Sequence, residues 1–344
     1  MKRVFALTIF IVTFLSGGLA AQNGGFAGVA TQLGMSPRGM SMSNTFTATT
    51  SEGIYPYYNP ALAAFKADSR QTDFTVAALD FDRVYQTAGI HFQLPPNAGI
   101  YFSLIRTGVT DIDERTLSGY PLGTFDAAEY QLGTSFGIRF NEKLNAGVGF
   151  KINYANYYED LEAATAVGVD LGFLYHLSPR LNFGLTVQDM FANYTWNSGE
   201  LYGNTQSRNV VNNFPVRYKL GLAFQEEVFT ITAEFEIQSY TSEVNQTEVF
   251  IDNDGIASTI ESLETINTSS GIFRLGGAWD AHERVTLRAG YEISDTSVSE
   301  SNSFSGGFSV HLPFDIFSPS VDYAFVREPY GVANMHVFAL RLHL

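Results

Sequence analysis

The acidic segment between residues 239 and 270 comes nearest to a pattern of residues that could do chemistry. Asp252-Asn253-Asp254-Gly255 with Glu261 matches part of a calcium-binding loop. The first ligand position of that loop falls on Phe250, which has no side-chain oxygen. The segment holds six acidic residues and no basic residue, which is typical of a solvated surface loop. The sequence therefore favours an acidic surface loop over calcium binding, and we predict no metal site.

Motifs for catalysis give little support to an enzyme. The sequence has no His-Glu-x-x-His metal motif and no phosphate-binding loop. It has no cysteine, which excludes a disulfide framework, a thiolate metal site and a cysteine nucleophile. The six histidines are scattered without metal-ligand spacing, at His91, His176, His282, His311, His336 and His343. We predict no catalytic residue, no enzyme activity and no cofactor.

Four charged residues have the spacing of ion pairs between two adjacent strands. Arg217 and Lys219 precede Glu226-Glu227, and Glu234 and Glu236 follow it. If Glu226-Glu227 is a two-residue hairpin loop, Lys219 faces Glu234 and Arg217 faces Glu236. Opposite charges that face each other across a hairpin support its register. We predict a structural charge ladder here, in preference to a polar path or an anchor for another segment.

The composition limits the class of protein. The chain has 344 residues, of which 45% are hydrophobic, 14% aromatic and only 16% charged, so it is not disordered. Its net charge of −15 argues against a nucleic-acid partner, which requires a basic surface. The mean hydropathy is near zero, which excludes a helical membrane protein but not a membrane barrel, whose strands alternate.

The first 21 residues have the pattern of a secretory signal peptide. A basic start at Lys2-Arg3 is followed by an apolar run from Val4 to Leu15 and a small-residue end at residues 16–21. The run is short for a membrane-spanning helix, which needs roughly 20 residues. We predict cleavage after Ala20 or Ala21 and export from the cytoplasm.

The rest of the chain alternates apolar and polar residues with the period of β-strands. Between 144 and 154, for example, Leu144, Val148 and Phe150 alternate with glycine, asparagine and lysine. The pattern predicts fourteen strands, near residues 74–82, 84–94, 98–107, 127–140, 144–154, 167–175, 180–190, 214–225, 228–238, 271–280, 284–294, 303–312, 320–328 and 334–344.

The length and polar face of these strands favour a membrane barrel over a soluble sandwich. Many run for about 10 to 14 residues, close to the roughly 9 to 11 that a tilted transmembrane strand needs. Their second face is glycine, serine, asparagine and threonine with few charges, which suits a barrel lumen. We predict an all-β fold, a fourteen-stranded antiparallel transmembrane β-barrel over residues 71–344.

Loop lengths supply an independent test of the barrel. Outer-membrane barrels alternate short periplasmic turns with long external loops. With the N-terminus in the periplasm, short turns fall at sites such as 95–97, 141–143 and 178–180, and the long loops 108–126, 191–213 and 239–270 all fall outside. The last strand ends in Phe338, Leu340 and Leu342, the kind of segment that the barrel-assembly machinery reads. We therefore predict a cell outer membrane protein in contact with outer-membrane lipid.

Residues 33–63 carry a resemblance to a known family. Gly34, Gly39 and three methionines, Met35, Met40 and Met42, lie in a stretch of small residues, and Asn59-Pro60-Ala61 follows just before the first strand. This resembles the N-terminal region of the FadL-type transporters of hydrophobic compounds and of their shorter PorV/PorQ relatives. The acidic pair usual before the motif is replaced by Thr50-Ser51-Glu52, which leaves the subfamily open.

The resemblance implies that residues 22–70 fold as a plug inside the barrel. The glycines would permit close approach, Asn59 would fix a turn before Pro60, and the methionines would fill space or contact a hydrophobic ligand. Two functions remain open. The first is passive transport of fatty-acid-like hydrophobic small molecules across the outer membrane. The second is a PorV/PorQ-like accessory role in type IX secretion, in which the barrel binds or shuttles a secreted cargo protein.

Overall fold

The computed structural model describes residues 26–66, 70–159, 161–197, 209–251, 257–295, 300–314, 318–328 and 333–343. The predicted signal peptide, the partial calcium pattern at 252–255 and the last residue of the chain lie outside these residues.

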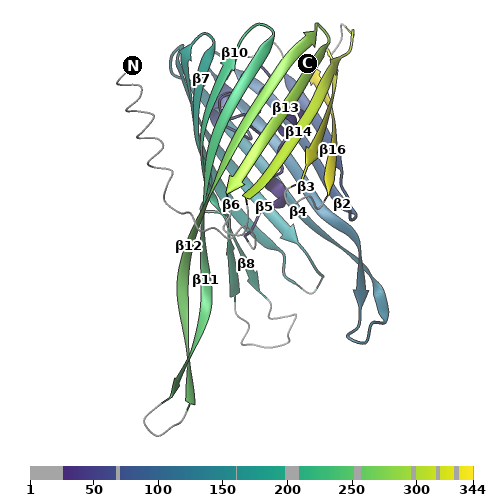
Figure 1. The fold of residues 1–344 in the computed structure, drawn as a ribbon, viewed down its shortest axis with the longest axis vertical. Coiled ribbons are helices and arrows are strands. Elements are labelled where there is room, and N and C mark those ends of the chain that lie inside the picture. The colour runs from purple at the N-terminus through teal and green to yellow at the C-terminus, as the bar shows by residue number, and fades with distance from the viewer. Residues whose placement is uncertain are drawn as a thin grey trace.

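Fourteen antiparallel strands form a closed barrel, as the sequence predicts (Figure 1). Each barrel strand pairs with its neighbours along the chain, and the first pairs with the last to close the barrel. The strands are β1 (Gln71–Ala78), β2 (Arg83–Leu94), β3 (Ala98–Arg115), β4 (Pro121–Arg139), β5 (Leu144–Asn156), β6 (Ala164–Ser178), β7 (Leu181–Met190), β10 (Val216–Gln225), β11 (Phe229–Ile251), β12 (Ala257–His282), β13 (Val285–Asp295), β14 (Glu300–His311), β15 (Ser320–Arg327) and β16 (Asn334–His343). Between β7 and β10, β8 (Asn193–Asn197) and β9 (Asn209–Asn213) form a separate two-stranded sheet.

The alternating sequence places apolar side chains on the outside of the barrel. On β10, Tyr218, Leu220 and Leu222 are exposed, whereas Arg217 and Lys219 between them are buried in the lumen. The same exposed apolar face recurs on strands around the barrel, as at Phe150, Phe273 and Leu340. Such a surface is stable only against lipid, so the barrel is transmembrane. No helix in the described parts of the chain is long and apolar enough to cross a membrane.

Two hairpins extend beyond the barrel wall. β11 and β12 continue as one long paired ribbon, and β3 and β4 continue as a shorter one (Figure 1). The sequence reading treats 108–126 and 239–270 as loops, and this is wrong for most of their length. Outside the membrane neither face of a ribbon has to be apolar, so the hydrophobic alternation that marks a strand is lost there.

The N-terminal stretch of the described chain lies inside the barrel. Residues 26–66, hereafter the inner segment, contain η1 (Ala30–Gln32), α2 (Pro37–Ser41) and η2 (Pro60–Ala64). They contact inward-facing glycines on strands around the barrel, where an added Cβ would overlap the backbone of the segment. These wall positions are Gly99, Gly137, Gly147, Gly172, Gly184 and Gly290. Glycine is required there because a backbone packs directly against a backbone.

The register between β10 and β11 differs from the one expected from the sequence. Lys219 faces Glu236 rather than Glu234, and Arg217 faces Gln238. The N–H of Glu226 donates to the carbonyl oxygen of Phe229, so the two residues of the tight turn are Glu227 and Val228. Moving the turn by one residue shifts each cross-strand pair by two, which keeps every side chain on its expected face.

The lipid-facing surface makes a prediction about stability. Replacing Leu220, near the middle of β10, with arginine should lower the free energy of unfolding by about 2 to 4 kcal/mol, because the charge would sit at the bilayer midplane. The measurement is denaturant unfolding of the protein refolded into phosphatidylcholine vesicles. Val228→Arg, at the turn, is the matched control and should cost at most about 1 kcal/mol. Equal effects at both positions would contradict the assigned membrane depth.

Candidate functional site in the barrel lumen

Asn59 ties the inner segment to itself and to the wall. Its Oδ1 accepts from the N–H of Ala61 at 3.0 Å, which caps η2. Its Nδ2 donates to the carbonyl oxygens of Thr47 at 2.6 Å and of Phe173 on β6 at 3.1 Å. Pro60 starts η2, and the Asn59-Pro60-Ala61 turn lies against Gly147 and Gly172. Both N–H donors and one of the two Oδ1 lone pairs of this buried amide are therefore used, and these bonds fix the turn against the wall.

Gly34 and Gly39 make room for Tyr58. Gly34 has φ +128°, and an added Cβ at Gly39 would overlap the ring of Tyr58. The hydroxyl of Tyr58 accepts from the N–H of Met35 at 3.0 Å and donates to Asn44 Oδ1 at 2.8 Å. Burial raises the pKa of Tyr58 well above its ordinary value, so the hydroxyl keeps the proton that it donates.

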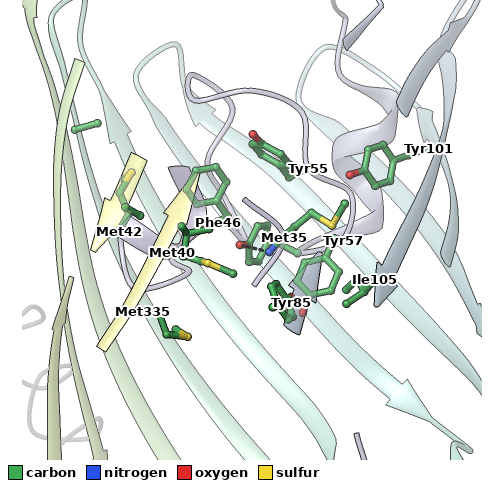
Figure 2. Close-up of a cluster of buried hydrophobic side chains, with 14 residues drawn as sticks. Met35, Met40, Met42, Phe46, Tyr55, Tyr57, Tyr85, Tyr101, Ile105 and Met335 are labelled. Carbon is green, nitrogen blue, oxygen red and sulfur yellow. Dashed lines mark hydrogen bonds between the residues drawn. The ribbon is translucent and has the colours of Figure 1, made fainter. Parts of the chain in front are cut away.

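The three methionines belong to one apolar cluster in the lumen. Met35, Met40 and Met42 are buried with aromatic residues of the inner segment and with side chains from β2, β3 and β16 (Figure 2). The aromatic and wall members include Phe46, Tyr55, Tyr57, Tyr85, Tyr101, Ile105 and Met335. Met40 also lines a cavity. Ligand contact by Met35, Met40 and Met42 stays a prediction.

A cavity of about 310 Å³ adjoins this cluster at the barrel end that carries the long β11–β12 hairpin. One side of the cavity is apolar, with Leu33 and Met40 from the inner segment and Val326 and Met335 from the wall. The other side is polar and includes Arg274 and Glu292, paired at 2.6 Å. Arg274 and Glu292 neutralise each other, and Arg327, which also lines the cavity, lies over the ring of Phe304, so the apolar side is the one that offers contact area to an apolar ligand.

The predicted charged residues lie in a larger network on the lumen wall. Lys219 Nζ is 3.9 Å from Glu234 and 3.6 Å from Glu236, and Arg274 pairs with Glu236 at 2.5 Å. Arg217 does not pair with Glu236, as expected from the sequence, but with Asp189 at 2.5 Å. The cause is the shifted register, which places Gln238 opposite Arg217. A structural role for the four residues stays a prediction.

A second group of buried charges is centred on Asp189, which the sequence does not predict to face the lumen. Lys151 Nζ lies 2.7 Å from Asp170 and 2.8 Å from Asp189, and Asp189 also binds Arg217. Asp189 has φ +61° at a register shift between β6 and β7, which turns its side chain into the lumen. The one available signal was the spacing of Lys151 and Asp170 on adjacent predicted strands. The irregularity that brings in Asp189 has no pattern in the sequence.

Ion pairs also join the inner segment to the wall. Arg38 binds Asp322 on β15 at 3.0 Å, and Glu52 binds Arg288 on β13 at 2.6 Å. Next to these pairs, Arg341 of β16 pairs with Asp73 at 2.7 Å and contacts the ring and hydroxyl of Tyr55. Each pair is almost fully buried, so breaking one would leave a charge unpaired in the lumen.

One serine has the spacing of a hydrolase motif but not its geometry. Gly133-Thr134-Ser135-Phe136-Gly137 has the form Gly-x-Ser-x-Gly, a match that the sequence reading missed. The motif needs a sharp turn between a strand and a helix to expose the nucleophile. Here all five residues lie inside β4, where Ser135 is buried. The match is therefore a consequence of small inward-facing residues on a barrel strand.

Comparisons with known proteins show the fold. No family model and no curated protein matches the sequence. Among solved structures, the Ralstonia pickettii toluene transporter TbuX matches 90% of this chain and 98% of its own, at 13% identity and a TM-score of 0.58. The Pseudomonas putida toluene transporter TodX matches 90% and 96%, at 14% identity and 0.59. A Pseudomonas aeruginosa FadL homologue matches 89% and 97%, at 12% identity and 0.63. The chain has a FadL-type barrel fold. None of the three is named as an enzyme.

The Asp189 network makes a prediction about stability. Asp189→Asn leaves Arg217 without its carboxylate and Lys151 with one partner, which should cost about 3 to 5 kcal/mol of unfolding free energy. The measurement is denaturant unfolding in detergent micelles. Arg115→Gln, which breaks the exposed Arg115–Asp113 pair at 2.9 Å, is the control and should change stability by less than about 1 kcal/mol. An Asp189→Asn protein as stable as the control variant would show that the network does not hold the wall.

Proposed function

We propose that the chain is an outer-membrane protein for the passive passage of hydrophobic small molecules. The observation that carries the proposal is the cavity of about 310 Å³, whose apolar side joins Leu33 and Met40 to Val326 and Met335. It opens beside the apolar lumen cluster, so a hydrophobic molecule that enters it finds a continuous apolar surface. The similar fold of two toluene transporters supports this class of cargo.

We infer that the inner segment acts as the plug of this barrel. It contacts wall glycines on strands from β3 to β13, so it fills the cross-section of the lumen. A second cavity of about 630 Å³ lies where the segment leaves the lumen, beside Phe65 and Lys66. Between β1, β2 and β3 the ladder runs without a register shift from residue 71 to residue 94. Release by movement of the plug is therefore favoured over release through that part of the wall.

The cavity makes a prediction about uptake. Met335→Trp adds bulk on the apolar side of the cavity and should reduce the initial rate of uptake at least about threefold, because the space for the ligand is lost. The measurement is uptake of radiolabelled toluene, and separately of oleate, by cells that express the protein. The two probes separate hydrocarbon-like from fatty-acid-like cargo.

The control for this experiment adds the same bulk outside the lumen. Val321→Trp, on the lipid-facing side of β15, should leave uptake unchanged. Both variants are first checked for normal unfolding in detergent. Unchanged uptake in Met335→Trp, or uptake no higher than in cells without the protein, would reject the transport proposal.

The plug makes a separate prediction about leakage. Asn59→Ala removes two donors and one acceptor and takes the side-chain partner from the buried Thr47 carbonyl and the Ala61 N–H, at about 1 to 3 kcal/mol each. The plug should loosen and the permeability to a small sugar should rise, as measured by swelling of proteoliposomes. Gln86→Ala is the control, because the exposed Gln86 amide accepts from Arg106 at 3.3 Å on the outer face of β2, away from the plug. Equal swelling of Asn59→Ala and wild type would contradict the plug.

A PorV/PorQ-like accessory role is the second candidate. The observation in its favour is the tip of the β3–β4 hairpin, where Leu117, Tyr120 and Leu122 are strongly exposed. Apolar side chains at a hairpin tip offer a contact for a protein partner. This role is distinguished from transport by two results together: no uptake above background, and co-purification of a secreted protein that is lost when Leu117 and Tyr120 are replaced by serine.

A further inference from the structure

Glu129 differs from the other buried carboxylates of the described residues. Each of the others has a lysine or arginine within ion-pair distance. Those paired carboxylates are Glu52, Asp73, Asp170, Asp189, Glu234, Glu236 and Asp322. Glu129, on β4, is 7% exposed and has no ion pair in the parts of the chain that the structure describes. A buried carboxylate without a cation is unfavourable unless a partner arrives from outside the chain.

Aromatic rings surround this carboxylate. Glu129 Oε1 accepts from the hydroxyl of Tyr157, and the Tyr157 ring stacks on Trp196 with centroids 5.0 Å apart. Trp196 is 5.5 Å from the ring of Tyr194, which in turn is 5.1 Å from Phe214. The faces of tyrosine and tryptophan rings attract cations. Both charge and ring electrostatics therefore favour a positive guest.

Unused hydrogen-bonding atoms gather at the same place. Glu129 Oε2, Gln131 Oε1 and the hydroxyl of Tyr194 are buried without a partner, and so is Asn153 Nδ2. Gln131 is two residues from Glu129 on the same face of β4, and its Nε2 donates to Asn153 Oδ1 across to β5 at 2.8 Å. Three acceptors and one donor at the unpaired carboxylate are therefore available to a guest.

We propose that the Glu129 cluster, made of Glu129, Gln131, Asn153, Tyr157, Tyr194 and Trp196, binds the primary ammonium group of a small organic cation with an apolar body. The three orphan acceptors match the three N–H donors of an ammonium group. The carboxylate supplies the counter-charge, and the rings contact the apolar body. An anionic head is rejected by like charge, and a hydroxyl head satisfies fewer of the acceptors.

The position of the cluster allows a guest to enter. Tyr157 is 36% exposed, so the Tyr157–Trp196 stack is the outer edge of the cluster. Tyr194 and Trp196 belong to β8, in the two-stranded sheet that is separate from the barrel ladder. They can move away from β4 and β5 without breaking a wall hydrogen bond. Binding of the cation does not depend on the proposed transport function. Passage of the bound cation through the barrel does, and in this respect the inference rests on the proposed function.

The test uses Trp196 as its own reporter. The chain has two tryptophans, and Trp279→Phe removes the lipid-facing one. The protein in detergent is titrated with 2-phenylethylamine, 2-phenylethanol and phenylacetate, which share one ring and differ in the head group. We expect a saturable change in fluorescence with the amine, and binding at least about tenfold weaker for the alcohol and the acid, since a charge-assisted contact is lost.

Two variants locate the site. Glu129→Gln keeps the shape of the side chain and should weaken amine binding about 10- to 100-fold. Tyr194→Phe removes only the hydroxyl and should weaken it less, which keeps the test available if Glu129→Gln folds poorly. Glu114→Gln is the matched control, because Glu114 accepts from Tyr158 at 2.5 Å on the less buried β3–β4 hairpin beyond the wall. It should bind the amine as the parent does.

Three results would each overturn the proposal: no saturable change with the amine, equal affinity for all three probes, or unchanged amine affinity in both Glu129→Gln and Tyr194→Phe. In each case the orphan atoms bind water alone. The result of this titration does not depend on the uptake of toluene and oleate measured with Met335→Trp. Failure of the ammonium site therefore leaves the transport proposal standing, and the reverse also holds.

Discussion

Closure of the hydrogen-bonded ladder is the constraint on which the rest of the structure depends. In lipid every backbone N–H and C=O must find a partner, and pairing β1 with β16 satisfies the two strands that would otherwise be edges. A closed ring of fourteen strands encloses a lumen that side chains of the wall alone do not fill. The inner segment lies in this lumen, and the wall glycines follow from its close approach. Backbone lies against backbone at Gly147 and Gly184, where no other residue leaves enough room.

The lumen also imposes a rule on charges. Side chains that face inward cannot reach bulk water, so each buried charge needs a partner at close range. On much of the wall from β5 to β13 the buried charges are paired, in one network around Asp189 and in another around Glu236. Strands β2, β3 and β16 instead contribute to the apolar cluster around Met35. The inner segment joins both regions, through Arg38 and Glu52 on the charged side and through its tyrosines and methionines on the apolar side.

The sequence predicts the barrel because lipid on one face enforces a strict period of two. Strand positions such as Leu144–Asn156 could be read almost to the residue for that reason. The prediction fails in the ribbon of β11 and β12 beyond the membrane, because no lipid requires one face of the strands to be apolar there. It also fails at the register of β10, because the choice between Glu226-Glu227 and Glu227-Val228 as the turn depends on tertiary packing and not on the alternation. Asp189 enters the lumen through a local bulge, which no periodic pattern contains. The face on which a residue lies could therefore be predicted on regular strands, whereas the position of Asp189 could not.

The same rule on charges gives Glu129 its significance. In a lumen where the other buried carboxylates hold a basic partner, an unpaired one is an exception that the fold could have removed with a glutamine. Its neighbours Gln131 and Tyr194 each have a buried acceptor atom without a partner as well. The cavity beside Met40 offers the opposite chemistry, an apolar surface beside the paired charges of Arg274 and Glu292. The lumen thus presents two environments of different chemistry on different strands, the cavity on the inner segment and β11 to β16 and the Glu129 cluster on β4, β5 and β8. Because they share no residue, the proposed passage of an apolar body and the proposed binding of a positive head group stand or fall separately.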